Sequence, residues 1–164
     1  QAVGVVPNTY TFSAAISACA KGNRWGRSLQ LLRSMQLWQA RPNTVSYSAA
    51  VSACAVCGEW AHAQGLLAEM LDLALTPNVI TYNATITACE RGRHWEGALE
   101  QLGCMHDRAV RRDVVTYTSA ISACEGDGAW ASALELFADM LGQRVDPNIM
   151  TFSSLMRALG RGLQ

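Results

Sequence analysis

Small hydrogen-bonding side chains recur at one point of the sequence, and their types suit binding chemistry. They follow one another at steps of 35 residues: Ser13, Ser48, Asn83 and Thr118. An apolar residue stands three positions before each of them, and residues three apart lie on one face of a helix. Such a stripe could recognise the edge of a nucleic-acid base held between apolar side chains. It could equally let neighbouring helices pack closely, and the residue types alone favour neither alternative.

Catalytic and metal-binding chemistry find no support in the sequence. His62, His94 and His106 are isolated surface candidates, and no serine–histidine–aspartate set, carboxylate cluster or phosphate-binding loop is present. Cys54 and Cys57 form a C-x-x-C pair, but no second pair or histidine cluster completes a tetrahedral site. Four of the six cysteines recur every 35 residues, as core cysteines of a repeat would: Cys19, Cys54, Cys89 and Cys124. We predict no enzyme activity, no metal and no cofactor.

The composition is that of a folded domain with no strong charge. Half of the 164 residues are apolar and 16% are charged, which is too apolar for a disordered segment. No uninterrupted apolar run is long enough for a membrane span. Thirteen basic residues balance thirteen acidic ones. Because nucleic-acid binders usually carry a basic excess, this balance lowers the expected non-specific affinity for phosphate.

A 35-residue period organises the whole chain, and such a period decides the fold before any single motif does. Three landmarks keep this step without insertion or deletion: the Pro-Asn pair that begins at Pro7, Pro42, Pro77 and Pro147, with Arg112-Asp113 in the remaining place; Trp25, Trp60, Trp95 and Trp130; and Met35, Met70, Met105 and Met140. We divide the chain into repeats 9–43, 44–78, 79–113 and 114–148 and a half repeat 149–164. Because the last repeat stops half-way and no targeting leader is visible, we interpret the sequence as a segment of a longer protein.

Each repeat predicts two helices joined by a short break. Apolar residues spaced three, one and three form the stripe of an amphipathic first helix over about residues 11–20: Phe12, Ala15, Ile16 and Cys19. The second helix has its own stripe, shown here for the first and fourth repeats: Trp25, Leu29, Leu32 and Met35; Trp130, Leu134, Phe137 and Met140. One hairpin cannot bury both stripes alone. We therefore predict an all-α, right-handed α-solenoid of stacked hairpins, with the tryptophans packed between helices.

Several motifs of the repeat resemble the pentatricopeptide-repeat (PPR) family. They are the V-[VI]-T-Y-[NST] pattern at residues 79–83 and 114–118, the Ala-Leu-x-x-Leu/Phe core and closing methionine of the second helix, and the final Pro-Asn. The resemblance covers residues 7–164, and the uniform repeat length resembles the P-type class. The tetratricopeptide repeat differs, because its period is about 34 residues and its W-x-x-L-G pattern is absent here.

The resemblance implies that the chain binds single-stranded RNA, with each base recognised by the fifth and the last residue of one repeat. The four recognition pairs on this sequence are Ser13 with Asn43, Ser48 with Asn78, Asn83 with Asp113, and Thr118 with Asn148. The family's code implies adenine for serine or threonine with asparagine and uracil for asparagine with aspartate. The implied RNA is 5′-A-A-U-A-3′, and Asn8 and Ser153 are halves of two further pairs.

The resemblance also implies contacts with the faces of the bases and with phosphates. The second residue of each repeat would sandwich the bases: Tyr10, Val45, Ile80, Val115 and Met150. Lys21 and Arg91 match a phosphate-contacting position at the end of the first helix, beside which Glu90 and Glu125 would repel phosphate. The family acts in the processing, stability or translation of RNA in chloroplasts or mitochondria.

Other interpretations remain open at the level of sequence. Asparagine or aspartate directly before a helix is an ordinary N-cap, so capping accounts for Asn43 or Asp113 as well as recognition does. A protein-interaction solenoid is favoured by the neutral charge and by the single lysine, Lys21. A third interpretation is the RNA-recognition arm of an RNA-cleaving or editing enzyme whose catalytic domain lies elsewhere. Single-stranded RNA binding without membrane association is our leading hypothesis.

Overall fold

The computed structural model describes residues 8–126 and 129–162, and every regular element in these residues is an α-helix. The helices are α1 (Thr9–Lys21), α2 (Trp25–Leu37), α3 (Thr44–Cys57), α4 (Trp60–Asp72), α5 (Val79–Arg91), α6 (Trp95–Asp107), α7 (Val114–Ala123), α8 (Trp130–Gly142) and α9 (Ile149–Gly162). None of these described helices combines the length and the apolar character that crossing a lipid bilayer requires. The predicted all-α class is confirmed.

The odd-numbered helices begin directly after an asparagine or aspartate, for a local reason. The first turn of a helix leaves backbone N–H groups without an acceptor inside the helix. The side-chain oxygens of Asn8, Asn43, Asn78 and Asp113 each accept the N–H of the third helical residue. Because Asn8 caps it, α1 begins at Thr9, two residues before the predicted start. Capping is therefore one role of the residue that closes each repeat.

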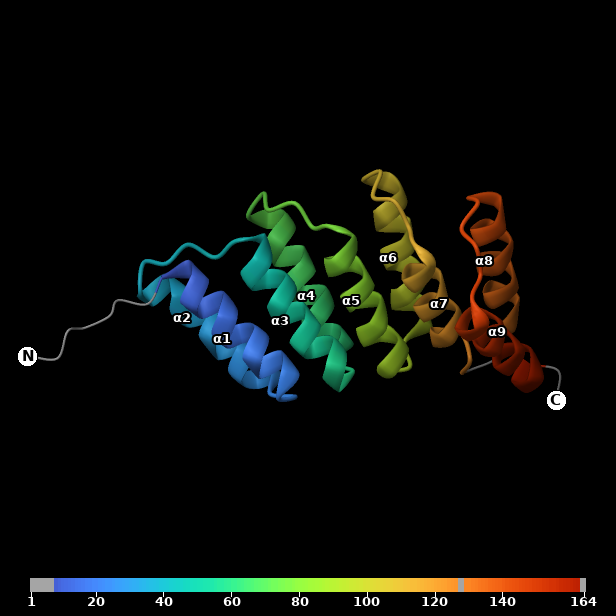
Figure 1. The fold of residues 1–164 in the computed structure, drawn as a ribbon, viewed down its shortest axis with the longest axis horizontal. Helices are drawn as coiled ribbons and strands as arrows, with labels where there is room; N and C mark the ends of the chain where they lie inside the picture. Colours follow the sequence, from blue (N-terminus) through green and yellow to red (C-terminus); the bar gives the residue numbers. More distant parts are fainter. Residues whose placement is uncertain (1–7, 127–128, 163–164) are drawn as a thin grey trace, which may run out of the picture.

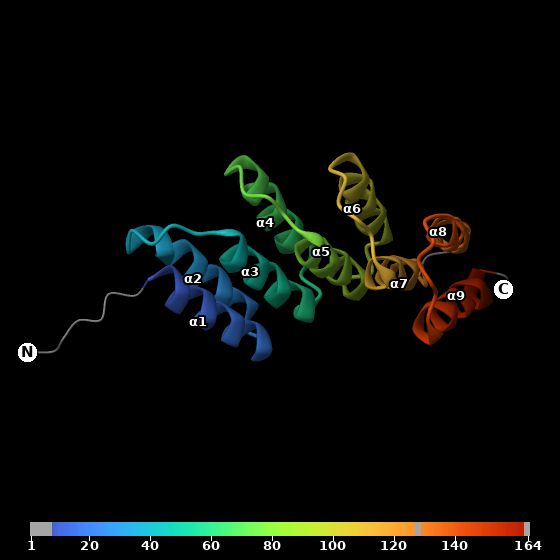
Figure 2. The same ribbon diagram turned by 45° about the horizontal axis from the view of Figure 1, so that its top comes forward.

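The odd-numbered helices form one continuous row, in which each helix packs against the next odd-numbered helix (Figure 1). The even-numbered helices lie along one side of this row. In the described part of the chain their backbones lie close only to the odd-numbered helices before and after them, whereas even-numbered neighbours meet through side chains, as where Trp25 of α2 lies 4.7 Å from His62 of α4 between ring centroids. Figure 2 shows α4, α6 and α8 standing apart on that side. Stacked hairpins of this kind make an α-solenoid, as the repeat predicted.

The core follows the contacts between the two sets of helices. The predicted stripe of the first helices is fully buried at Ile16, Val51, Ile86 and Ile121, and so are the closing methionines Met35, Met70, Met105 and Met140. Cys54, Cys89 and Cys124 are buried too, and burial raises the pKa of their thiols. These three cysteines therefore act as small core residues, as predicted. Leu134 departs from the predicted second stripe, because it is exposed on α8.

Tryptophans connect neighbouring hairpins. Trp60 packs against the core of its own hairpin and against that of the next one, and Trp95 does the same one repeat later. The His94 ring lies on Trp60 with 3.8 Å between ring centroids, so His94 is half-buried rather than on the surface. Gly92 leaves room for the same indole, since a Cβ at this residue would collide with Trp60. The predicted packing role is confirmed for Trp25, Trp60 and Trp95.

Candidate nucleic-acid interface

Exposed apolar side chains form a ladder along the row of odd-numbered helices. This apolar ladder consists of the second residue of each helix: Tyr10, Val45, Ile80, Val115 and Met150. Their exposed fractions run from 50% at Val115 to 81% at Tyr10. Large apolar residues usually belong to the buried core, so five exposed ones at equivalent positions have no packing explanation. Their arrangement suits contact with flat apolar faces of a ligand.

A hollow of about 280 Å³ opens between two rungs of the apolar ladder, Val45 on α3 and Ile80 on α5. Its polar lining includes Ser48 and Asn78, which form the second recognition pair. The residues expected to sandwich a base and those expected to recognise its edge therefore meet at one place. The lining also includes Ser52, which continues the polar stripe one turn along α3.

The third recognition pair is joined by direct hydrogen bonds. The Asn83 amide donates through Nδ2 to Asp113 Oδ1 at 3.0 Å and to Asp113 Oδ2 at 3.3 Å. The Thr116 hydroxyl lies 2.6 Å from Asn83 Oδ1 and 2.9 Å from Asp113 Oδ1. Asn83 is on α5 and Asp113 caps α7, so the pair bridges two neighbouring helices of the row. The structure thus brings together two residues that the sequence separates by 30 positions.

The second and fourth pairs are joined through a threonine instead. The Ser48 and Thr81 hydroxyl oxygens are 2.7 Å apart, and Thr81 donates to Asn78 Oδ1 at 3.1 Å. The fourth pair repeats this geometry, with 2.8 Å between the Thr118 and Thr151 hydroxyl oxygens. Thr151 in turn donates to Asn148 Oδ1 at 3.0 Å. The linking threonine is the third residue of α5 or of α9.

The first pair is not joined. Ser13 is only 7% exposed, and its hydroxyl donates to the Thr9 carbonyl of the same helix at 2.8 Å. Asn43 accepts the Ser46 N–H at 3.0 Å as the cap of α3. The sequence placed Ser13 on an outward-facing stripe, whereas the structure turns it inward. A serine side chain is short enough to bond to the preceding turn of its own helix, as helical serines often do.

The capping asparagines keep their donor group for other partners. Asn43, Asn78 and Asn148 use Oδ1 to accept the N–H of the third helical residue. Among the described residues, no hydrogen bond is made by Nδ2 of these three side chains. Capping and base recognition are therefore compatible, because each uses a different end of the amide.

The carboxylate of Asp113 is held in its ionised form. Burial alone would raise its pKa, but hydrogen bonds from the Thr116 backbone, the Thr116 hydroxyl and the Asn83 amide outweigh burial and lower the pKa. Asp113 is therefore an acceptor at neutral pH, and it presents negative charge to the positive end of α7.

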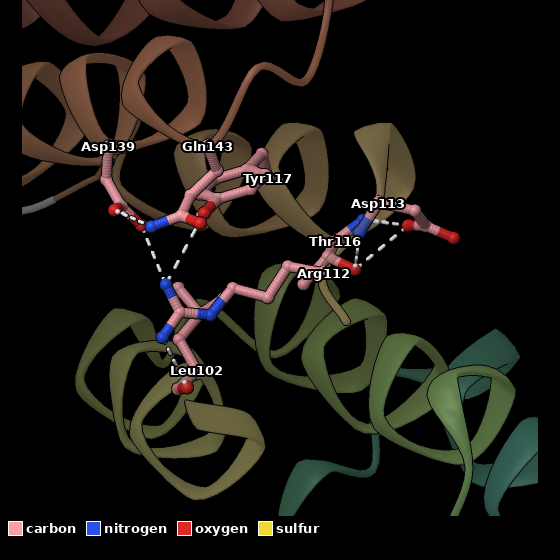
Figure 3. Close-up of polar contacts among 7 residues, drawn as sticks. All are labelled: Leu102, Arg112, Asp113, Thr116, Tyr117, Asp139 and Gln143. Carbon is pink, nitrogen blue, oxygen red and sulfur yellow. Dashed lines mark hydrogen bonds and ion pairs between the residues drawn. The ribbon is translucent and has the colours of Figure 1, made fainter. Parts of the chain in front are cut away.

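A second polar network anchors the same loop on the opposite side of the array (Figure 3). Arg112 occupies the place where other repeats have proline, and its Nη1 donates to Asp139 Oδ2 of α8 at 2.7 Å. Its Nη2 donates to the Leu102 carbonyl of α6 at 3.1 Å, while Tyr117 donates to Asp139 Oδ2 at 2.7 Å. Arg112 thus connects α6, α7 and α8 next to Asp113, which caps α7 and is the predicted recognition residue.

Family models identify the repeat. Models of the PPR repeat family match residues 42–91, 77–125 and 112–161, and a model of the PPR repeat matches residues 10–38. The chain belongs to the PPR repeat family. Its sequence has no match among curated proteins.

Solved PPR structures share the fold. PPR10 in complex with an 18-nt psaJ RNA element has a TM-score of 0.79 and 22% identity, covering 94% of this chain and 23% of PPR10. The PPR domain of Arabidopsis thaliana protein-only RNase P 1 in complex with tRNA has a TM-score of 0.81 and 15% identity, covering 93% of this chain and 81% of that domain. PPR10 from maize has a TM-score of 0.76 and 26% identity, covering 96% and 23%. This PPR chain thus spans about a quarter of the length of PPR10.

Three cationic side chains of this PPR array lie at the ends of odd-numbered helices. Lys21 is exposed at the end of α1, and Arg91 donates to the Val56 carbonyl at the end of α3 at 2.7 Å. Arg161 occupies the equivalent position on α9, which the sequence analysis missed although it lies two periods beyond Arg91. Its Nη1 donates to the Glu125 carbonyl at 3.3 Å.

One of the two glutamates expected to repel phosphate is neutralised. Glu125 lies 2.7 Å from the guanidinium of Arg157, and its side chain is only 17% exposed. Arg157 stands on α9 where the earlier repeats have serine or threonine. The sequence contained this signal, but only the structure shows that the arginine reaches back to the preceding repeat.

Proposed function

We propose that this PPR array binds single-stranded RNA along the row of odd-numbered helices, with one base per repeat. The observation that carries this proposal is the apolar ladder with hydrogen-bonding pairs between its rungs. At the hollow between Val45 and Ile80 both kinds of residue line one cavity. A base offers the matching chemistry, because it has two flat apolar faces and a polar edge.

Helix spacing supports one base per repeat. A flat ring between two side chains needs a van der Waals contact of about 3.5–4 Å on each face, or roughly 7–8 Å in total. Packed helices lie about 8–10 Å apart, so adjacent rungs offer the required gap. Consecutive bases of a stacked strand are only about 3.4 Å apart. The bound bases must therefore be unstacked, which restricts the ligand to single strands.

The pairs supply donors and acceptors for base edges. Asn83 and Asp113 together offer an amide N–H and a carboxylate oxygen, which complement the carbonyl oxygen and the N–H of uracil. The other three pairs combine a hydroxyl with an asparagine, and we assign adenine to them, giving 5′-A-A-U-A-3′. The base preference and a role in organellar RNA processing, stability or translation rest on the family code and on these donor patterns.

The proposed affinity depends little on phosphate charge. Lys21, Arg91 and Arg161 stand at the helix ends, and two of these three also bond to a backbone carbonyl. For single strands the salt slope is about −0.7 per phosphate contact, so three contacts give a slope of about −2. Most of the binding free energy would then come from the faces and edges of the bases.

The test is binding of labelled RNA oligonucleotides that contain A-A-U-A, compared with scrambled and uracil-only controls at several salt concentrations. The proposal predicts tighter binding of A-A-U-A with a shallow salt dependence. Equal binding of all three oligonucleotides with a steep salt dependence would contradict base recognition.

Absence of RNA binding at low salt would favour a protein partner. The neutral net charge of the chain supports this second candidate, since thirteen basic residues face thirteen acidic ones. Replacing Tyr10 and Ile80 with aspartate should then abolish capture of that partner, because both side chains are exposed rungs of the apolar ladder.

A further inference from the structure

We infer that the third residue of α5, α7 and α9 is a positioning residue that sets the hydrogen-bond polarity of each recognition pair. These residues are Thr81, Thr116 and Thr151, and all three are fully buried. None of them can touch a ligand from its position in the structure. Their effect on RNA rests on the proposed function, but their effect on the pairs does not.

The Thr81 hydroxyl has two neighbours that could accept its proton, Asn78 Oδ1 at 3.1 Å and Ser48 Oγ at 2.7 Å. Asn78 Oδ1 is a carbonyl oxygen that can only accept, whereas the Ser48 hydroxyl can also donate. Both contacts are hydrogen bonds only when Thr81 donates to Asn78 and Ser48 donates to Thr81, and we infer that this arrangement is the one adopted. Thr81 Oγ1 then faces Ser48 with a lone pair.

The Ser48 hydroxyl is therefore forced to donate to Thr81 across their 2.7 Å contact. With its proton committed, Ser48 presents only lone pairs to the hollow, while Asn78 presents its Nδ2 donor. Ser48 is then the acceptor of the second pair, and Asn78 beside it is the donor. Adenine offers an amino donor beside a ring-nitrogen acceptor on its pairing edge, whereas guanine offers a carbonyl acceptor beside an N–H donor. The fixed polarity therefore favours adenine over guanine at this pair.

Thr151 repeats the arrangement between Thr118 and Asn148, with contacts of 2.8 Å and 3.0 Å. Thr116 acts on a side-chain amide instead. Its hydroxyl lies 2.6 Å from Asn83 Oδ1, so the carbonyl end of the amide faces Thr116 and the NH₂ end faces Asp113. Asp113 Oδ1 lies 2.9 Å from the same hydroxyl but already accepts the Asn83 amide and the Thr116 N–H, so the single Thr116 proton goes to the shorter contact with Asn83 Oδ1. Rotating the amide by 180° would set a carbonyl oxygen against the Asp113 carboxylate and an N–H against the Thr116 proton. In the third pair Asn83 is thereby fixed as the donor and Asp113 as the acceptor. This pattern fits the carbonyl oxygen and the N–H of uracil.

α3 provides a natural control, because its third residue is Ser46. The Ser46 hydroxyl donates to the backbone carbonyl of Asn43 at 2.8 Å and accepts the Asn43 N–H at 2.9 Å. It does not reach Ser13, whose own proton goes to the Thr9 carbonyl. Ser46 is buried and completes a capping box like Thr116, so its removal perturbs the helix start without disturbing any joined pair.

The first experiment needs no RNA. In ¹⁵N-labelled protein, exchange of the Asn83 side-chain amide protons with water is measured for the wild type, Thr116→Val and Thr116→Ser. Valine keeps the branched shape without the hydroxyl. Exchange in Thr116→Val should become at least several-fold faster, Thr116→Ser should restore it, and the amide of the exposed Asn23 should not change. Unchanged exchange at Asn83 in Thr116→Val would overturn the inference.

The second experiment measures base preference. RNAs with adenine or guanine at the second recognised position are bound to the wild type, Thr81→Val, Thr81→Ser and Ser46→Ala. The adenine preference should fall by about fivefold in Thr81→Val, the scale of one hydrogen bond. Thr81→Ser should retain it, and Ser46→Ala should leave the preference at the first position unchanged.

An adenine preference that survives in Thr81→Val, or a loss of affinity for both RNAs by the same factor, would show that Thr81 has only a structural role. If the wild-type protein binds none of the RNAs, the proposed function fails. The exchange experiment on Asn83 then still decides whether the third residue orients the pair.

Discussion

The first and third recognition pairs occupy equivalent places in the array, yet they differ in how their members meet. Asn83 reaches across from α5 to Asp113 at 3.0 Å, whereas Ser13 turns back to the Thr9 carbonyl of its own helix. The helices around the two pairs are arranged alike, so side-chain length explains the difference. The Asn83 amide is long enough to reach the neighbouring helix directly. The shorter Ser48 hydroxyl makes a contact between helices only because the Thr81 hydroxyl lies between it and Asn78. The backbone repeat thus supplies four equivalent places, and individual side chains decide which of the proposed recognition pairs are joined.

Replacing Asn83 with serine removes the member that reaches across the third pair, and the largest effect is expected here. The uracil preference at the third base should fall by about 1–3 kcal/mol, the usual range for a two-point base contact. Competition between RNAs with uracil or adenine at this base measures the change. If Asn83→Ser left the preference intact, the assignment of the third pair would be wrong.

Arg112→Met tests whether the ion pair behind Asp113 stabilises the loop that carries it. The substitution removes the guanidinium that lies 2.7 Å from Asp139 and leaves this carboxylate with the Tyr117 hydroxyl but no cation, and the Arg112 side chain is only 18% exposed. We expect the free energy of unfolding to fall by about 2 kcal/mol, between the values for surface and buried pairs. Chemical denaturation measures the loss. Arg111→Met is the matched control, because Arg111 is exposed in the same loop and should change stability by less than about 0.5 kcal/mol.

Asp113→Asn keeps a cap oxygen on α7 but removes the charge, which separates capping from electrostatics. The folded-state pKa of Asp113 is lowered from 3.8, so the charge stabilises the fold above that pH, and the stabilisation disappears as the pH falls through the lowered pKa. At neutral pH the variant should be less stable by about 0.5–1 kcal/mol. Thermal unfolding of both proteins at pH 7 and pH 3 measures this difference. A difference that stays constant on acidification would assign the effect to packing.

The smallest effect is expected at the first pair. Ser13→Ala removes a hydroxyl that is buried against Thr9, so the base preference at the first position should change by less than about twofold. Ser48→Ala is the companion variant. It removes a hydroxyl that lines the hollow between α3 and α5, and it should reduce the preference at the second position by about fivefold. If Ser13→Ala and Ser48→Ala changed the base preference equally, joined and unjoined pairs would not differ in recognition.

The sequence predicted the features that follow from periodicity and missed those that depend on side-chain reach. A constant 35-residue step predicted the hairpins, the buried Ile86, the packing of the half-buried Trp60, and the second-residue position that proved to be exposed at Ile80. The asparagine or aspartate before each odd-numbered helix predicted the caps. By contrast, the sequence does not reveal that the Ser13 hydroxyl bonds to the Thr9 carbonyl of its own helix and not to a residue of the next odd-numbered helix.

Arg112 illustrates the same limit. A residue in place of a proline marks a departure from the repeat, but its partners lie 10 and 27 residues away along the chain on two other helices. The threonine links were also invisible, because Thr81 looks like an ordinary first-turn residue. Arg161 differs from these, since its position two periods beyond Arg91 could have been found from the sequence alone.

The separation of the even-numbered helices has a mechanical consequence. In the described part of the chain the backbones of these helices lie close only to the odd-numbered row, and the helices meet one another through side chains such as Trp25 and His62, so bending or twisting the array shifts side-chain contacts between them and leaves backbone packing intact. The odd-numbered helices pack directly against one another. We therefore expect changes in the curvature and pitch of the array to alter the side-chain contacts between the even-numbered helices more than the interval between neighbouring rungs of the apolar ladder.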